Sequence, residues 1–240
     1  MIKEVDYDAF LEYLASTNEK EKAVEQLRRM LERQVTQFGN VLDLGCGTGI
    51  MFKPLGDYFG RIVAIDHENR LGALAEKEMQ VEFVPVDFFD FETDEKFDCV
   101  LACYSLWEVP FAAWKHFFEK VKSILTPGGC LIVIDSYHLG EFDNPWFNFN
   151  VKSVREPASL DWCAYLAAMG RPSVSERYFA QVFADSPERM YEILRFGFGT
   201  AKGKRFYRKN KDKILVDLKS KIVGDRVVVN AGQIITLIWL

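Results

Sequence analysis

Short runs of apolar residues alternate along the chain with longer stretches in which apolar side chains recur every three or four positions. Runs of the first kind predict buried β-strands, and the second spacing predicts amphipathic helices. From residue 40 the two patterns alternate, which favours a largely parallel sheet with helices on both faces, a doubly wound α/β fold. The expected strands cover residues 40–44, 61–65, 81–90, 97–104, 128–135 and 173–183, and 226–239 fits either a strand or a hairpin around Asn230-Ala231-Gly232.

Helical spacing precedes the first strand and recurs between the later ones. Residues 1–17 and 19–38 each carry an apolar stripe, and Thr17 or Asn18 can cap the second of these helices. Another helix is expected to begin at Ser186-Pro187, because serine is a good N-cap and proline fits the first helical position. The remaining expected helices cover 48–58, 69–78, 111–124, 157–169 and, with a strongly basic composition, 205–222.

One segment, 137–156, has no clean period and is unusually rich in aromatic residues. A long irregular segment in a compact domain usually serves as a lid or a binding loop. We therefore expect this segment to enclose a ligand.

The turn after the first strand carries the strongest chemical signal. Residues 41–49 read V-L-D-L-G-C-G-T-G, so three alternating glycines follow an apolar strand. Glycine tolerates a positive φ, and its lack of a side chain at Gly45 or Gly47 lets backbone approach a ligand closely. The spacing differs from the G-x-G-x-x-G of dinucleotide sites, and the carboxylate of Asp43 suits a cationic ligand better than a pyrophosphate.

Two later strand ends carry acids that fit the rest of a nucleoside. Asp66 ends the second strand 21 residues after Gly45, where a carboxylate can accept hydrogen bonds from both hydroxyls of a ribose. Asp87 follows the third strand and offers an acceptor for an adenine amine, beside the apolar ring of Phe88. The alternatives are a turn or cap role for Asp66 and core packing for Phe88.

The nine residues from Val41 to Gly49 resemble the first motif of the class I S-adenosylmethionine-dependent methyltransferases. The F-D-x-V pattern at 97–100 and the L-x-P-G-G turn at 125–129 are similar to later motifs of that family. The resemblance is close over 41–136 and holds only in outline elsewhere. It implies a seven-stranded, mostly parallel sheet with one antiparallel strand, a Rossmann-like methyltransferase fold, here with a helical and aromatic cap.

The resemblance also implies the cofactor and its contacts. S-adenosylmethionine is the expected methyl donor and S-adenosylhomocysteine the product. The residue after the third strand's aspartate is implied to contribute a backbone donor to the adenine. We add Cys103, at the end of the fourth strand. The expected cofactor contacts are Asp43, Gly45, Cys46, Gly47, Gly49, Asp66, Asp87, Phe88 and Cys103.

Length and composition fit one domain over 1–240. The 240 residues are 49% hydrophobic, enough to bury one sizeable core. We expect an N-terminal helical cap at 1–38, a cofactor-binding half at 39–136 and a substrate-side half at 137–240. Insertions are expected at 137–156 and 185–225 within that last half.

Charge and special residues narrow the setting. The formal net charge of −5 weighs against a general nucleic-acid binder. The sequence has no long apolar run and no apolar leader, so we expect neither a membrane span nor secretion but a cytoplasmic protein. The five cysteines have no Cys-x-x-Cys pair and fit small buried side chains in a reducing compartment. Three histidines show no metal-ligand spacing, so no metal is expected.

The motifs leave the methyl acceptor, its reacting atom and the oligomeric state open. Candidate general bases follow the fourth and fifth strands: Glu108, Asp135 and His138. His138 titrates nearest neutrality, although each has an ordinary structural alternative as a surface, capping or strand-ending residue. Aromatic residues that fit an acceptor pocket, or alternatively the core, are Tyr7, Tyr104, Trp107 and Trp146.

Three functions remain under comparison. A methyltransferase acting on a small molecule fits the aromatic segment 137–156. A nucleic-acid or protein methyltransferase would use the basic stretch 202–213, which otherwise fits a solvated helix face. A non-catalytic protein that binds the cofactor is the third, because a fold alone does not establish turnover.

Overall fold

The computed structural model describes residues 7–34, 37–68, 71, 80–106, 109–136, 170–195 and 201–240. Their contacts divide into two compact units. The first contains residues 7–22 and 178–233, and the second contains 23–136, 170–177 and 234–240, in both cases within the described ranges. The single-domain organisation expected from the sequence stays a prediction.

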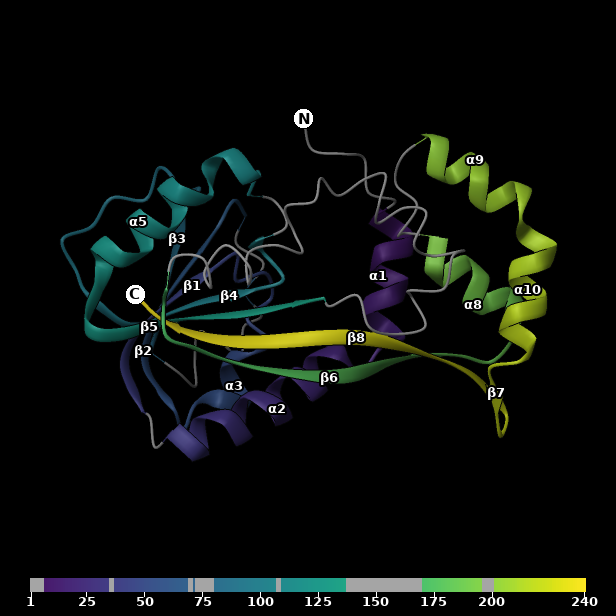
Figure 1. Ribbon diagram of the computed structural model, residues 1–240, viewed down its shortest axis with the longest axis horizontal. Helices are drawn as coiled ribbons and strands as arrows, with labels where there is room; N and C mark the ends of the chain where they lie inside the picture. Colours follow the sequence, from purple (N-terminus) through teal and green to yellow (C-terminus); the bar gives the residue numbers. More distant parts are fainter. Residues whose placement is uncertain are drawn as a thin grey trace. The chain divides into compact units, whose positions relative to one another are not determined.

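A mixed, mostly parallel sheet forms the core of the second unit (Figure 1). Four strand pairs are parallel: β1 with β2, β2 with β3, β1 with β4 and β4 with β5. The order is β3-β2-β1-β4-β5-β8-β6, which confirms the doubly wound α/β class. Its strands are β1 (Phe38–Leu44), β2 (Phe59–Asp66), β3 (Val81–Pro85), β4 (Phe97–Cys103), β5 (Leu125–Ser136), β6 (Ser173–Ala184) and β8 (Arg226–Trp239).

The central strands have apolar sequences because their side chains are buried. Leu42 of β1 lies beside Val100 of β4, which in turn lies beside Leu131 of β5, and all three are fully buried. Parallel strands covered on both faces carry nearly continuous apolar runs. Helix α5 (Trp114–Ile124), preceded by the 3₁₀ turn η2 (Phe111–Ala113), lies on one side of these strands, and α2 (Glu19–Gln34) and α3 (Phe52–Leu55) lie on the other (Figure 1). Of the helix expected at 48–58, only the single turn α3 forms. The helix expected at 69–78 lies mostly outside the described residues.

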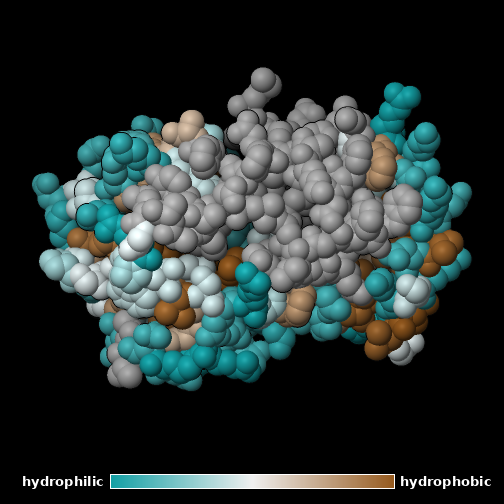
Figure 2. Space-filling model, viewed as in Figure 1, coloured by the Kyte–Doolittle hydropathy of each residue, from teal (hydrophilic) through white to brown (hydrophobic). Residues whose placement is uncertain are grey.

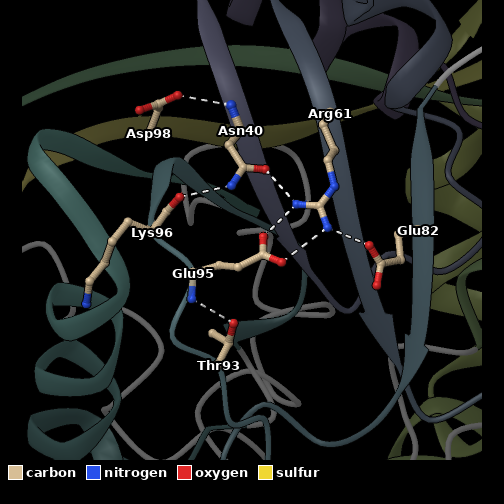
Figure 3. Close-up of polar contacts among 7 residues, drawn as sticks. All are labelled: Asn40, Arg61, Glu82, Thr93, Glu95, Lys96 and Asp98. Atoms are coloured by element: carbon tan, nitrogen blue, oxygen red, sulfur yellow. Dashed lines mark hydrogen bonds and ion pairs between the residues drawn. The ribbon is translucent and has the colours of Figure 1, made fainter.

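A polar network ties together the strands at the edge where β1 and β2 begin (Figure 3). The Arg61 guanidinium donates to Glu95 Oε2 at 2.6 Å and to Asn40 Oδ1 at 3.2 Å, and it also pairs with Glu82. Asp98 Oδ2 accepts the backbone N–H groups of Gly39 and Asn40, both at 3.0 Å. The guanidinium of Arg61 lowers the pKa of Glu95 by hydrogen bonding. Because parallel strands share a direction, this edge is opposite the one where β1, β2 and β4 end.

The first unit is built mainly from helices: α1 (Tyr7–Ala15), α8 (Pro187–Leu194), α9 (Ala201–Lys209) and α10 (Lys211–Lys219). They pack around a core that includes Tyr191, Tyr207 and Leu218. Ser186 caps α8 as expected, because its hydroxyl accepts the N–H of Arg189 at 3.1 Å. Thr17 provides the matching contact before α2, where its hydroxyl accepts the N–H of Glu19 at 3.2 Å.

One sequence expectation in this unit was wrong. The basic helix expected at 205–222 is two helices, because Asn210 leaves the helical conformation with φ −106° and ψ 15°. Of the two alternatives for 226–239, the strand is confirmed: β8 runs through Asn230, and the short strand β7 (Ile222–Val223) forms a hairpin with the start of β8. That hairpin turns at Gly224, whose φ of 64° suits the first position of a tight turn. The sheet thus has an eighth short strand beyond the seven expected.

Candidate functional site

All three glycines of the loop after β1 adopt left-handed backbone conformations. Their φ angles are 71° at Gly45, 54° at Gly47 and 68° at Gly49, a region that costs other residues about 1–2 kcal/mol. A Cβ at Gly45 would lie 2.9 Å from the Cβ of Ser105, and one at Gly49 would lie 2.9 Å from Leu71 Cδ2. A Cβ at Gly47 would meet no atom within 4 Å from the described residues beyond its two chain neighbours. Packing therefore requires the outer two glycines, whereas Gly47 borders open space.

Hydrogen bonds fasten this loop to the end of β2. The N–H groups of Gly45 and Cys46 donate to the Ile65 carbonyl at 2.9 and 3.2 Å. The N–H of Gly47 donates to Asp66 Oδ2 at 2.9 Å. Two of the expected cofactor residues, Gly47 and Asp66, are therefore in direct contact. Asp66 therefore holds the loop, and its expected contact with a ribose stays a prediction.

His67 connects the two strand-end acids. Its backbone N–H donates to Asp66 Oδ1 at 2.7 Å, and its Nε2 lies 3.8 Å from Asp87 Oδ2. Asp87 Oδ1 accepts the N–H of Phe89 at 2.7 Å, which fixes the turn after β3. A carboxylate oxygen can accept more than one hydrogen bond, so both acids retain capacity for a ligand. Sequence reasoning missed His67, although its position directly after Asp66 placed it at the same sheet edge.

The ring of Phe88 packs against α5. It makes an edge contact with Phe117 at a centroid distance of 5.2 Å, and Lys120 Nζ lies 5.5 Å from its centre. Lys120 also donates to the carbonyl of Phe89 at 2.7 Å. These contacts show that the ring of Phe88 packs against α5, which was the alternative to a ligand contact. The backbone N–H of Phe88 stays the expected contact with the adenine.

Two buried residues accompany the glycines: Asp43 precedes the loop and Cys46 is within it. The side chain of Asp43 is 2% exposed, near the end of β1. Burial raises the pKa of the Cys46 thiol to about 12, and the negative charges of Asp43 and Asp66 act in the same direction. The thiol is therefore protonated near neutral pH, and the expected contact of Cys46 with the cofactor stays a prediction.

The end of β4 adds an unexpected group. Tyr104, directly after β4, has a φ of 56°, and its N–H donates to the Ile134 carbonyl at 2.8 Å. Ser105 follows, with its Oγ buried and without a hydrogen-bond partner in the described part of the chain. Its Cβ occupies the space beside Gly45. The sequence signal for Ser105 was its place just after β4, since β4 is the parallel neighbour of β1. Cys103, partly exposed at the same strand end, stays an expected contact.

The candidate bases and pocket aromatics are less defined. Asp135 lies inside β5, is 2% exposed, and its Oδ1 accepts the N–H of Ser136 at 2.7 Å. Trp107, Glu108, His138 and Trp146 lie outside the described residues, as does the side chain of Tyr7. Their roles stay predictions. No three His, Cys, Asp or Glu side chains gather as a metal site would require within the described ranges. In the same ranges, no helix is both long and apolar enough for a membrane crossing.

Comparison with known proteins matches residues 41–129, which contain this loop and both acids, to a family of methyltransferase domains. This match and the methyltransferase relatives described next support the resemblance to the class I S-adenosylmethionine-dependent methyltransferases. An uncharacterized methyltransferase of Staphylococcus carnosus (strain TM300) is 25% identical over 129 residues, covering 54% of this chain and 56% of that protein. A Geobacillus sp. (strain WCH70) relative described as a methyltransferase is 24% identical over 147 residues, covering 56% of this chain and 59% of its own. The chain therefore spans just over half the length of these curated relatives.

Several solved structures share the fold. The N-methyltransferase NodS from Bradyrhizobium japonicum has a TM-score of 0.56 at 14% identity, covering 92% of this chain and 96% of its own. YcgJ from Bacillus subtilis has a TM-score of 0.58 at 16% identity, covering 90% and 98%. A complex of DhpI with S-adenosylhomocysteine has a TM-score of 0.51 at 24% identity, covering 72% and 89%. These likenesses concern the fold.

Proposed function

We propose that the protein uses S-adenosylmethionine to methylate a small molecule. The cofactor would be held by the loop 45–49, by Asp66 and Asp87, and by the buried charge of Asp43. The observation that carries this proposal is the contact between the Gly47 N–H and Asp66 Oδ2 at 2.9 Å, beside open space at Gly47. It brings the loop and the ribose-type acid to one point, as an adenosyl ligand requires.

The chemistry of these residues fits the parts of this cofactor. Asp66 can accept from the two ribose hydroxyls, and Asp87 from the adenine amine. Asp43, 2% exposed, places negative charge beneath the loop where a sulfonium or ammonium is favoured. The buried Oγ of Ser105 is a further polar group without a partner in the described chain. The DhpI and NodS structures with S-adenosylhomocysteine add support from proteins of the same fold.

The chain's contribution to the reaction is mainly placement. When bound, S-adenosylmethionine supplies an activated methyl group that a nucleophile displaces in line. Holding the two reactants in line is worth roughly 7–11 kcal/mol, whereas a positioned base contributes about 10²–10⁴-fold in rate. A base is needed only for an acceptor that is protonated at working pH. Asp135, Glu108 and His138 stay candidates for that role.

Two sequence features support a small acceptor over a nucleic acid or a protein. The segment 137–156 concentrates aromatic residues that suit enclosing a small substrate. The net charge of −5 opposes general attraction to a phosphate backbone. The basic stretch also does not run as one helix, since α9 ends at Lys209 and α10 starts at Lys211. Cytoplasmic location remains a proposal alongside this reading.

Incubation of the protein with methyl-labelled S-adenosylmethionine and fractionated cell extract tests the proposal. We expect label in the small-molecule fraction. Label in RNA or protein would contradict the proposal of a small-molecule acceptor, while still supporting methyltransferase activity. Cofactor binding without label in any fraction would favour a non-catalytic protein.

A further inference from the structure

A pocket of about 540 Å³ opens among α8, α9 and α10, within the first unit. Four of its lining side chains are cations: Arg195 of the α8 end, Lys204 and Arg208 of α9, and Lys211 of α10. Glu192 is the one carboxylate in that lining. The pocket is therefore strongly positive in a chain whose formal net charge is −5.

The charges in this pocket are not balanced. Glu192 Oε2 pairs with Arg195 Nη1 at 3.1 Å. In the described part of the chain, no carboxylate lies within ion-pair distance of Lys204, Arg208 or Lys211. Among the described residues, four cations thus line one cavity with a single carboxylate, which already pairs with Arg195, so an anion that enters the cavity is attracted by the excess positive charge.

The local sequence produces this convergence. Lys204 and Arg208 are four residues apart on α9, so they share a helix face. Arg208 Nε donates to the carbonyl of Lys204 at 3.3 Å, which holds its guanidinium along that face. Lys211 opens α10 after the break at Asn210, and its ammonium lies 5.3 Å from the ring centre of Tyr191. The break thus brings a third cation to the same wall.

A rigid pair of tyrosines backs the pocket. The rings of Tyr191 and Tyr207 stack with centroids 4.3 Å apart and an interplanar angle of 8°. The Tyr207 hydroxyl donates to the Tyr191 carbonyl at 2.6 Å, and the Tyr191 hydroxyl donates to the Tyr207 carbonyl at 3.3 Å. Both hydroxyls are therefore engaged, and burial raises the pKa of Tyr207. The groups left to meet a ligand are the three cations.

We propose that this pocket binds the phosphate monoester group of a small phosphorylated ligand. A monoester dianion concentrates its charge and three acceptor oxygens in a small volume, which matches three donors converging on one cavity. An extended nucleic-acid backbone needs cations along a track. On α10 the track is interrupted by Asp212 and Asp217, although the outer surface of α9 and α10 is mainly hydrophilic (teal at the right of Figure 2).

Calorimetry with ribose 5-phosphate, and with ribose as the uncharged control, tests this site directly. The wild type should bind ribose 5-phosphate and not ribose at pH 7.5. The double variant Arg208→Gln with Lys211→Gln should bind at least about tenfold more weakly, since each lost charge-assisted hydrogen bond is a large fraction of such an affinity. Lys204→Gln provides a second, single-site variant with the same expected direction.

The matched control removes two cations of the same helices that do not line the pocket, Lys209→Gln with Lys219→Gln. It should keep the wild-type affinity within about twofold. Affinity should also fall below about pH 6, where the monoester becomes a monoanion. Equal loss in the control pair, or no preference for ribose 5-phosphate over ribose, would overturn the site. If affinity for single-stranded RNA rises with the length of the RNA, these cations form a nucleic-acid-binding surface and the phosphate monoester site is contradicted.

Discussion

The N–H of Gly47 donates to Asp66 Oδ2 at 2.9 Å, so one carboxylate both shapes the glycine loop and lies where a ribose is expected. The second oxygen of Asp66 accepts the N–H of His67 at 2.7 Å. Both carboxylate oxygens of Asp66 therefore accept a backbone N–H, one from the loop after β1 and one from the residue after β2. We therefore expect cofactor affinity to depend on Asp66 in two ways, through the conformation of the loop and through hydrogen bonds to the ribose.

Replacing Asp66 with Asn should weaken S-adenosylhomocysteine binding strongly. The amide keeps the size but loses the charge, and hydrogen bonds to charged groups are worth about 1.5–3 kcal/mol each. We expect at least a tenfold loss by calorimetry. Asp98→Asn is the matched control, because Asp98 also accepts two backbone N–H groups but at the opposite sheet edge. It should lower stability and leave affinity unchanged. Equal affinity for the wild type and Asp66→Asn would show that Asp66 does not contact the cofactor.

Replacing Gly47 with Ala separates backbone strain from ligand approach. The left-handed φ of 54° costs alanine about 1–2 kcal/mol of stability, while the added methyl group meets no protein atom within 4 Å. Gly128→Ala carries the same two properties, with a φ of 84° and open space, at the start of β5. Thermal unfolding should show similar losses for both. Only Gly47→Ala should lose cofactor affinity, and equal affinities in the two variants would contradict ligand approach at Gly47.

Replacing Gly45 with Ala should disturb the loop from inside the protein. Its Cβ would lie 2.9 Å from the Cβ of Ser105, and overpacking of this kind costs typically about 1–3 kcal/mol. Removing the obstacle with Ser105→Gly should restore part of the loss in the double variant. A double-mutant cycle measured by urea unfolding checks the coupling. Additive effects of the two substitutions would show that this contact does not set the glycine requirement.

The Cys46 thiol should resist alkylation in the folded protein. Its pKa of about 12 leaves almost no thiolate at pH 8, and the thiolate is the reactive form. Mass spectrometry after iodoacetamide treatment should find Cys46 unmodified in native protein and modified in urea. Because the folded pKa is raised, the thiol's contribution to stability is present below the unfolded pKa near 9 and is lost as pH rises towards 12. Rapid native modification at pH 8 would contradict the buried, protonated thiol.

The sequence predicted the framework of parallel strands because buried parallel strands consist of nearly continuous apolar residues. That framework alone explains why Asp66 lies beside the glycine loop, since β1 and β2 are parallel neighbours that end at one edge. The end of β4 shares this edge, yet nothing in a single sequence shows that Ser105 fills the space beside Gly45. That contact depends on how closely two strand ends pack, which periodicity does not encode.

Local conformation was harder to predict than strand order. The helical spacing of 205–222 continues through Asn210, and the break is revealed by the backbone angles of Asn210, φ −106° and ψ 15°. Similarly, Gly224 and not Asn230 turns the chain into β8, because β8 stays extended where its side chains are buried. The break places Lys211 beside Lys204 and Arg208 in one pocket, an arrangement that a single continuous helix would not predict.

The most direct measurement of the central claim is calorimetry of the wild-type protein with S-adenosylhomocysteine and, separately, with NAD. The glycine spacing, Asp43 and Asp66 predict binding of S-adenosylhomocysteine and none of NAD under the same conditions. Comparable affinity for NAD, or no binding of S-adenosylhomocysteine by the folded protein, would contradict the assignment of this loop to S-adenosylmethionine.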